Sequence, residues 1–152
     1  MAIQNIFVVG AGLMGSGIAQ NAITCGFDVT LNDKQQAAVE RAQVVIKKAL
    51  AREVSKGRMT QEAMDEALTH LTVDSGMEGA KKADLVIEAI YENLEAKQAV
   101  FTELEDLCPA KTIFASNTSS ISLTALAAAT KRPSRVVGMH FFSPVPKMKL
   151  CE

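Results

Sequence analysis

A glycine-rich hexapeptide near the N-terminus constrains the fold of this chain more than any other feature. It matches the pattern G-x-G-x-x-G and lies between an apolar, β-branched run at residues 3–9 and a helix-forming stretch that ends at Gly26. In such a strand–turn–helix unit the first glycine permits the tight turn, the second leaves space for a pyrophosphate, and the third lets the helix approach the strand. The helix N-terminus then offers free N–H groups to the phosphates. The alternative is a glycine-rich turn in some other α/β protein. The six residues are Gly10, Ala11, Gly12, Leu13, Met14 and Gly15.

An acidic residue follows at the position where a dinucleotide site needs one. Residues 27–31 have the composition of a strand and end at Asn32 and Asp33, 18 residues after Gly15. A carboxylate there accepts hydrogen bonds from the 2′-hydroxyl of an adenosine ribose and repels a 2′-phosphate. Asp33 therefore favours NAD over NADP, although Lys34 beside it softens that preference. The alternative is that Asp33 is only a turn residue.

The rest of the chain alternates helical and strand-like segments. Residues 35–70 are rich in helix formers, break at Lys56-Gly57 and restart at Thr60, which predicts a helical hairpin inserted between the second and third strands. Alternation of this kind predicts parallel pairing, so we expect an α/β doubly wound, mostly parallel sheet (Rossmann-like) in one domain covering residues 1–152. Further strands are predicted at residues 71–73, 85–89, 112–115 and 135–139, and further helices at 94–107 and 122–129.

Composition argues against several other classes of protein. Sixteen basic and 17 acidic side chains give a net charge of −1, so no field of one sign points to nucleic acid or an anionic membrane. The three cysteines are widely spaced and form no Cys/His cluster, so we expect neither a disulfide framework nor a metal site. The sequence shows no signal peptide and no apolar run near the roughly 18 residues of a membrane-spanning helix. The expectation is a cytoplasmic protein.

Two polar segments follow strands late in the chain. Residues 116–120 read Ser-Asn-Thr-Ser-Ser, and residues 139–143 read Met-His-Phe-Phe-Ser. Because the carboxyl ends of parallel strands meet at one edge of a sheet, we expect these hydroxyls and His140 to form a ligand site there. Without further context, a lone histidine beside two phenylalanines is more often a packed core residue. His70, the other histidine, is expected at the surface of an amphipathic helix.

Together these segments resemble the 3-hydroxyacyl-CoA dehydrogenase family, specifically its 3-hydroxybutyryl-CoA type. The matching pieces cover nearly the whole chain: GAGLMGSGIAQ, Asp33, DLVIEAIYENLEAK, FASNTSS and GMHFFSPVPKMKLCE. The resemblance implies NAD as the cofactor and an acyl-CoA as the substrate. It implies oxidation of (S)-3-hydroxyacyl-CoA to 3-oxoacyl-CoA, or the reverse reduction, in fatty-acid or butanoate metabolism. It also implies a homodimer for full-length members.

The resemblance assigns roles to individual residues. His140 matches the catalytic base, Glu152 the acid that pairs with it, and Ser119 the serine that hydrogen-bonds the substrate oxygen near the nicotinamide. An imidazole suits the first role because it accepts and returns a proton near neutral pH. Lys56 matches a lysine that contacts the CoA phosphates. Besides the hexapeptide and Asp33, the cofactor-lining positions are Glu92, Lys97, Asn117, Ser119 and Ser143.

Simpler readings exist for several of these residues. Glu152 can be a solvated chain end, Glu92 and Lys97 an ordinary charge pair at a helix start, and Lys56 a solvated turn lysine. Family members usually carry asparagine at the position of Ser143, which puts the cofactor contact there in doubt. They usually carry valine at the position of Cys151, where cysteine has a similar volume.

The family pattern continues past Glu152 into a helical domain that supplies the dimer interface and one wall of the acyl-CoA cleft. We therefore expect a truncated chain that corresponds to the N-terminal NAD-binding domain. Two alternatives to a complete dehydrogenase follow: an isolated NAD-binding module with little or no turnover, and a non-catalytic structural relative.

Overall fold

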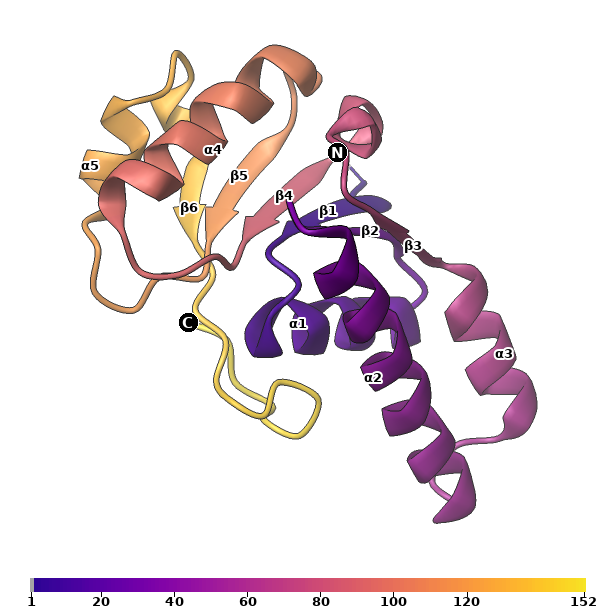
Figure 1. The fold of residues 1–152 in the computed structure, drawn as a ribbon. Helices are drawn as coiled ribbons and strands as arrows, with labels where there is room; N and C mark the ends of the chain where they lie inside the picture. The colour runs from indigo at the N-terminus through magenta and orange to yellow at the C-terminus, as the bar shows by residue number, and fades with distance from the viewer. Residues whose placement is uncertain (1) are drawn as a thin grey trace.

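The computed structural model describes residues 2–152 and shows a six-stranded sheet with helices on both faces (Figure 1). The strand order is β3-β2-β1-β4-β5-β6, and each neighbouring pair is parallel, which confirms the expected doubly wound α/β fold. The order reverses between β1 and β4, and ligands of open α/β sheets bind at the carboxyl ends of the strands beside such a reversal. The strands are β1 Asn5–Val9, β2 Asp28–Asn32, β3 Leu71–Asp74, β4 Leu85–Glu88, β5 Ile113–Ser116 and β6 Val136–Gly138.

Two hydrophobic cores lie on opposite faces of the sheet. Along β1, Ile6 and Val8 belong to the first core and Phe7 and Val9 to the second, because successive side chains of a strand point to opposite faces. Burial on both faces explains the continuous apolar run of this strand. The first core packs against α1 (Leu13–Thr24), α2 (Gln36–Ser55) and α3 (Gln61–Thr69), and the second against α4 (Leu94–Leu107) and α5 (Leu123–Ala128).

The predicted helical hairpin is confirmed as α2 and α3. The Thr60 side chain caps α3 by accepting a hydrogen bond from the Ala63 amide, as its position before the helix predicts. His70 differs from the prediction: it follows α3 as its C-cap, is half-buried, and its Nδ1 lies 2.7 Å from Oδ1 of Asp28. The helix must end there because Leu71 begins β3, and the parallel pairing of β2 with β3 brings His70 beside Asp28.

Residues 139–152 leave the sheet as a loop that folds back on itself (yellow in Figure 1). Val145, in the middle of the loop, is buried in the first core; a Cβ on Gly17 of α1 would lie 3.0 Å from its Cβ. Phe141 and Cys151 then form an isolated antiparallel bridge. The loop is therefore docked on α1 and closed by its own backbone pairing. Two short 3₁₀ segments, η1 (Glu78–Lys82) and η2 (Pro133–Arg135), complete the structure.

Within residues 2–152, none of the helices combines the length and the apolar character that crossing a membrane requires.

Candidate active site

The glycine turn joins β1 to α1 with the geometry that a dinucleotide needs. Gly10 has φ +104°, a left-handed conformation that glycine adopts without strain. A Cβ on Gly15 would lie 1.7 Å from the Gly10 carbonyl oxygen, so the helix start is pressed against the turn. A Cβ on Gly12 would meet no atom within 4 Å, which shows open space beside the backbone at this point.

The N-terminus of α1 is free to bind an anion. Its first turn carries no acidic residue, and within residues 2–152 no side chain caps it. Uncapped N–H groups and the helix dipole favour a phosphate at such an end. The Asp33 carboxylate is fixed beside the turn, where Oδ2 accepts from the Ala11 amide and Oδ1 from the Gln35 amide, both at 3.0 Å. These residues fit a dinucleotide pyrophosphate with its adenosine ribose toward Asp33.

Two neighbouring hollows lie along the carboxyl ends of the strands. The first, of about 540 Å³, is lined by Gly10, Gly12 and Asp33 together with residues of α4. The second, of about 380 Å³, is bounded by the loops after β4, β5 and β6. Residues 89–91 line both hollows and form their common wall. The second hollow gathers six residues that the sequence singled out: Met14 of α1 and, from three different loops, Glu92, Asn117, Ser119, His140 and Ser143.

His140 and Glu152 face each other across the closed loop. Each donates its backbone N–H to the carbonyl of the other, at 2.8 Å and 3.0 Å, as a hydrogen-bonded antiparallel pair does. Directly opposed residues of such a pair have neighbouring side chains. His140 Nδ1 accordingly lies 3.5 Å from Oε2 of Glu152, which leaves Nε2 as the ring nitrogen without a carboxylate partner within the described residues. The Phe142 ring packs against the imidazole, with the ring centroids 4.7 Å apart.

Asn117 joins the two polar loops. Its backbone N–H donates to the Glu88 carbonyl, and its side-chain Oδ1 accepts from the Phe141 amide at 2.9 Å. One acceptor therefore holds the loop after β6, which carries His140, against the loop after β5, which carries Ser119. Asn117 lines the second hollow, and its structural contact is to the protein backbone.

An ionic cluster extends from the wall of the second hollow into the buried interior. The Lys97 ammonium is 2.7 Å from Oε1 of Glu88 and 2.9 Å from Oε1 of Glu92, and it donates to the Ile90 carbonyl at 3.3 Å. Oε2 of Glu92 accepts from the Thr118 hydroxyl at 2.7 Å. Burial opposes ionisation of Glu92, but the hydrogen bonds from Lys97 and Thr118 outweigh it and lower the pKa of this carboxyl below its ordinary value. Glu92 reaches the hollow, whereas Lys97 is not among its lining residues.

Three features were not singled out from the sequence. Glu88 is fully buried and anchors Lys97, Phe142 packs on the His140 imidazole, and Tyr91 lies in the wall common to both hollows. Glu88 left a signal, because a carboxylate closes an otherwise apolar strand, Leu85–Glu88. A buried charge needs a partner, and that requirement points to Lys97. No group of three or more His, Cys, Asp or Glu within residues 2–152 is arranged to hold a metal ion.

Comparison with known proteins assigns the family. A family model described as 3-hydroxyacyl-CoA dehydrogenase, NAD binding domain, matches residues 5–152. The chain belongs to this family. A probable 3-hydroxybutyryl-CoA dehydrogenase of Bacillus subtilis is 48% identical over 152 residues, which are 100% of this chain and 53% of the relative. The 3-hydroxybutyryl-CoA dehydrogenase of Clostridioides difficile is 45% identical over 149 residues, 98% of this chain and 53% of the relative.

Solved structures agree with the sequence match. The crystal structure of a 3-hydroxybutyryl-CoA dehydrogenase from Escherichia coli K12 has a TM-score of 0.97 at 43% identity and covers 99% of this chain and 32% of that chain. The crystal structure of an (S)-3-hydroxybutyryl-CoA dehydrogenase from Ralstonia eutropha has a TM-score of 0.96 at 39% identity and covers 99% of this chain and 53% of that chain. This chain, an NAD-binding domain of the 3-hydroxyacyl-CoA dehydrogenases, spans about half the length of the curated relatives named above.

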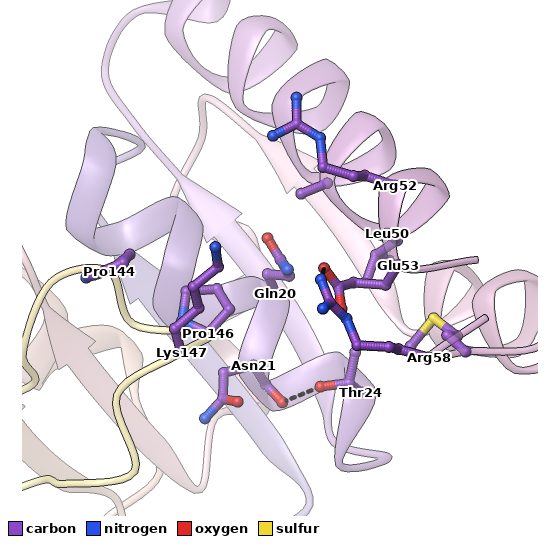
Figure 2. Close-up of a pocket in the computed structure, with 12 residues that line it drawn as sticks. Gln20, Asn21, Thr24, Leu50, Arg52, Glu53, Arg58, Pro144, Pro146 and Lys147 are labelled. Atoms are coloured by element: carbon purple, nitrogen blue, oxygen red, sulfur yellow. Dashed lines mark hydrogen bonds and ion pairs between the residues drawn. The ribbon is translucent and has the colours of Figure 1, made fainter. Parts of the chain in front are cut away.

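The dehydrogenase domain has a further cleft, which lies along α1 and is separate from the two hollows described above. It is a cavity of about 580 Å³ between α1, α2 and the closed loop (Figure 2). Lys147 and Pro146 lie on one side, and Arg52, Glu53 and Arg58 on the other. Nε of Arg58 is 2.6 Å from Oε2 of Glu53, so part of the positive charge is already paired. The exposed Lys56 follows α2 as its C-cap and is not among the residues that line this cavity.

Proposed function

We propose that this chain supplies the cofactor site and the acid–base pair of an enzyme that interconverts (S)-3-hydroxyacyl-CoA and 3-oxoacyl-CoA. The observation that carries the proposal is the pairing of Glu152 with His140, which lines, together with Ser119, a hollow that adjoins the dinucleotide cavity. The relatives at 45–48% identity are named as 3-hydroxybutyryl-CoA dehydrogenases, which supports the same reaction.

The residues of the chain divide the work of proton transfer. His140 takes the proton of the substrate 3-hydroxyl on Nε2, because Nδ1 faces Glu152. The Glu152 carboxylate favours the tautomer with the proton on Nδ1 and stabilises the imidazolium that forms. The Ser119 hydroxyl donates a hydrogen bond to the substrate oxygen. NAD, when bound, would supply the acceptor for the hydride that leaves the carbon bearing this oxygen.

The cofactor is held by groups already described. The hexapeptide from Gly10 to Gly15 and the start of α1 bind the pyrophosphate, and Asp33 binds the adenosine ribose. The negative charge of Asp33 favours NAD over NADP. Glu92, Asn117 and Ser119 would line the nicotinamide end of the site in the second hollow, with Lys97 holding Glu92 in place.

The acyl-CoA substrate follows a groove along α1. Ser143 lines the catalytic hollow and also a hollow of about 490 Å³ beside Gly12, which shares Pro144 and Pro146 with the basic cavity of Figure 2. Shared lining residues therefore link the three hollows in a series that runs from His140 to Arg52, Arg58 and Lys147. We assign the basic end to the CoA phosphates, because guanidinium and ammonium groups bind phosphate by charge-assisted hydrogen bonds. Lys56, at the end of α2, adds charge to that end.

A titration followed by a turnover assay tests the proposal. NADH binding is measured by fluorescence with NADPH as the comparison, and acetoacetyl-CoA is then added while NADH absorbance is followed. His140→Gln is expected to bind NADH normally and to lose turnover. His70→Gln is the matched control, because His70 precedes β3 at the opposite edge of the sheet. Turnover that survives in His140→Gln contradicts the assignment of the base, and absence of NADH binding contradicts the proposal as a whole.

A second candidate function is an NAD-binding module with little or no turnover. It is favoured by the family model that matches residues 5–152, which is itself described as an NAD binding domain. NADH binding without loss of NADH on addition of acetoacetyl-CoA would establish it. The presence of His140, Ser119 and Glu152 in one site argues against a third candidate, a structural relative without catalysis. For the whole enzyme we retain the expectation of a cytoplasmic homodimer, which sedimentation of the full-length protein tests.

A further inference from the structure

The cluster of Glu88, Lys97 and Glu92 carries more negative than positive charge, and two of its three side chains are fully buried. The side chains of Lys97 and Glu88 are 1% and 0% exposed, whereas Glu92, 42% exposed, extends from them to the wall of the catalytic hollow. Two carboxylates against one ammonium leave one excess negative charge. Charges in a buried setting act over longer distances than charges in water, because the effective dielectric constant is lower.

The hydrogen bonds of the cluster show that Lys97 is not free to contact a cofactor. Its three N–H groups are matched by three oxygens, one each from Glu88, Glu92 and the Ile90 backbone. Glu88 is equally committed, because Oε1 also accepts from the Ile90 amide at 2.7 Å and Oε2 from the Ser116 hydroxyl at 2.6 Å. Lys97 and Glu88 therefore affect a ligand through charge and not through contact.

We propose that this cluster sets the relative affinity of the domain for oxidised and reduced cofactor, with its excess negative charge favouring NAD⁺. The oxidised nicotinamide ring carries a positive charge and the reduced ring is neutral, so a fixed anion beside the ring binds the two forms unequally. The inference rests on the proposed function, which places the nicotinamide in the hollow lined by Glu92, Ser119 and His140. Glu88 contributes one of the two negative charges of the cluster. No sequence motif assigns it a role in cofactor binding.

The substitution Glu88→Gln tests the proposal with little change of shape. The amide oxygen can still accept from Lys97 and the Ile90 amide, and the amide nitrogen can donate to Ser116 Oγ. The charge of the cluster becomes zero. We expect the ratio of the Kd for NAD⁺ to the Kd for NADH to rise by about fivefold, because the substitution removes one negative charge from a partly buried site and so weakens the binding of the positively charged ring. Calorimetric titration of each cofactor measures the two constants.

The double variant E88Q/K97M is the matched control. It removes the buried pair but leaves Glu92, so the net charge returns to that of the unmodified chain. If the charge of the cluster sets the ratio of the two Kd values, the double variant should have the ratio of the unmodified chain, even if its affinities for NAD⁺ and NADH both fall. A ratio unchanged in E88Q, or changed equally in the double variant, overturns the inference. Failure of the unmodified chain to bind either cofactor would instead overturn the proposed function.

Discussion

Substituting Gly15 with alanine separates the packing role of the glycine turn from its binding role. The added Cβ would lie 1.7 Å from the Gly10 carbonyl oxygen and 2.8 Å from its carbon. Ordinary C···O contacts begin near about 3.3 Å, so the two backbone segments must separate by roughly 1.6 Å. Backbone cannot rotate away as a flexible side chain can, and Gly10 is held by its amide, which donates to the Asn32 carbonyl at 2.8 Å.

The expected cost follows from this geometry. Adding atoms to a packed interior costs about 1–3 kcal/mol, and a contact between two backbone segments belongs at the upper end, about 3 kcal/mol. For a domain of this size each kcal/mol lowers the Tm by about 2–4 °C, so Gly15→Ala should lower it by about 9 °C. Circular dichroism melts of the two proteins, together with NADH titration, measure both effects.

Gly12→Ala is the control in the same turn. Its Cβ would meet no protein atom within 4 Å, so the fold should lose about 1 kcal/mol or less, mainly through the poorer N-cap. Because the methyl group occupies the space assigned to the pyrophosphate, NADH should bind at least about tenfold more weakly. A Gly15→Ala protein that melts like the unmodified chain would refute the packing argument. A Gly12→Ala protein that binds NADH normally would refute the placement of the pyrophosphate.

Three further predictions use single side chains. Tyr91, 73% exposed and the only tyrosine of a chain without tryptophan, lines both hollows, so NADH should quench its emission; Tyr91→Phe should abolish this signal and keep the fold. Hydrogen bonds from the Asn5 amide and from Lys111 hold the pKa of Asp84 well below its usual range. Its ionised form therefore stabilises the fold above the unfolded-state pKa of about 3.9, and that stability is lost as the pH falls toward the lower folded-state pKa. Asp84→Asn should lower the free energy of unfolding at neutral pH and flatten its decline toward acid in urea melts; equal pH dependence of both proteins would contradict this. Asp33→Asn should raise the affinity for NADPH relative to NADH by about tenfold, measured by fluorescence, because the charge that repels a 2′-phosphate is removed; an unchanged preference would show that Asp33 does not select the cofactor.

Local sequence determined most of the elements. The uninterrupted apolar run of β1 predicts a strand buried on both faces, and the helix break at Lys56-Gly57 with the cap at Thr60 predicts the two helices of the hairpin. These signals act between residues a few positions apart, so they do not depend on how the rest of the chain folds. The exception was His70, whose partner Asp28 is far away in the sequence.

The sequence predicted which residues belong to the candidate site but not how they are arranged in space. The motifs singled out His140, Ser119 and Glu152, whereas the closed loop that pairs His140 with Glu152 depends on the Phe141–Cys151 bridge and on the burial of Val145 against α1. Nothing in the local pattern of these residues specifies that fold-back.

Only the tertiary structure decided which buried charges meet. Glu88 ends a strand and Lys97 lies on the following helix, and their pairing joins them to Glu92 and, through Ser116 and Thr118, to the loop after β5. The sequence contains each of these residues as an ordinary strand-end or helix-start feature. Their arrangement as a cluster comes from the parallel pairing of β4 with β5, which places two strand ends side by side, and Glu88 and Lys97 are shielded from water there. Partners brought together by sheet order are long-range contacts, and local periodicity does not encode them.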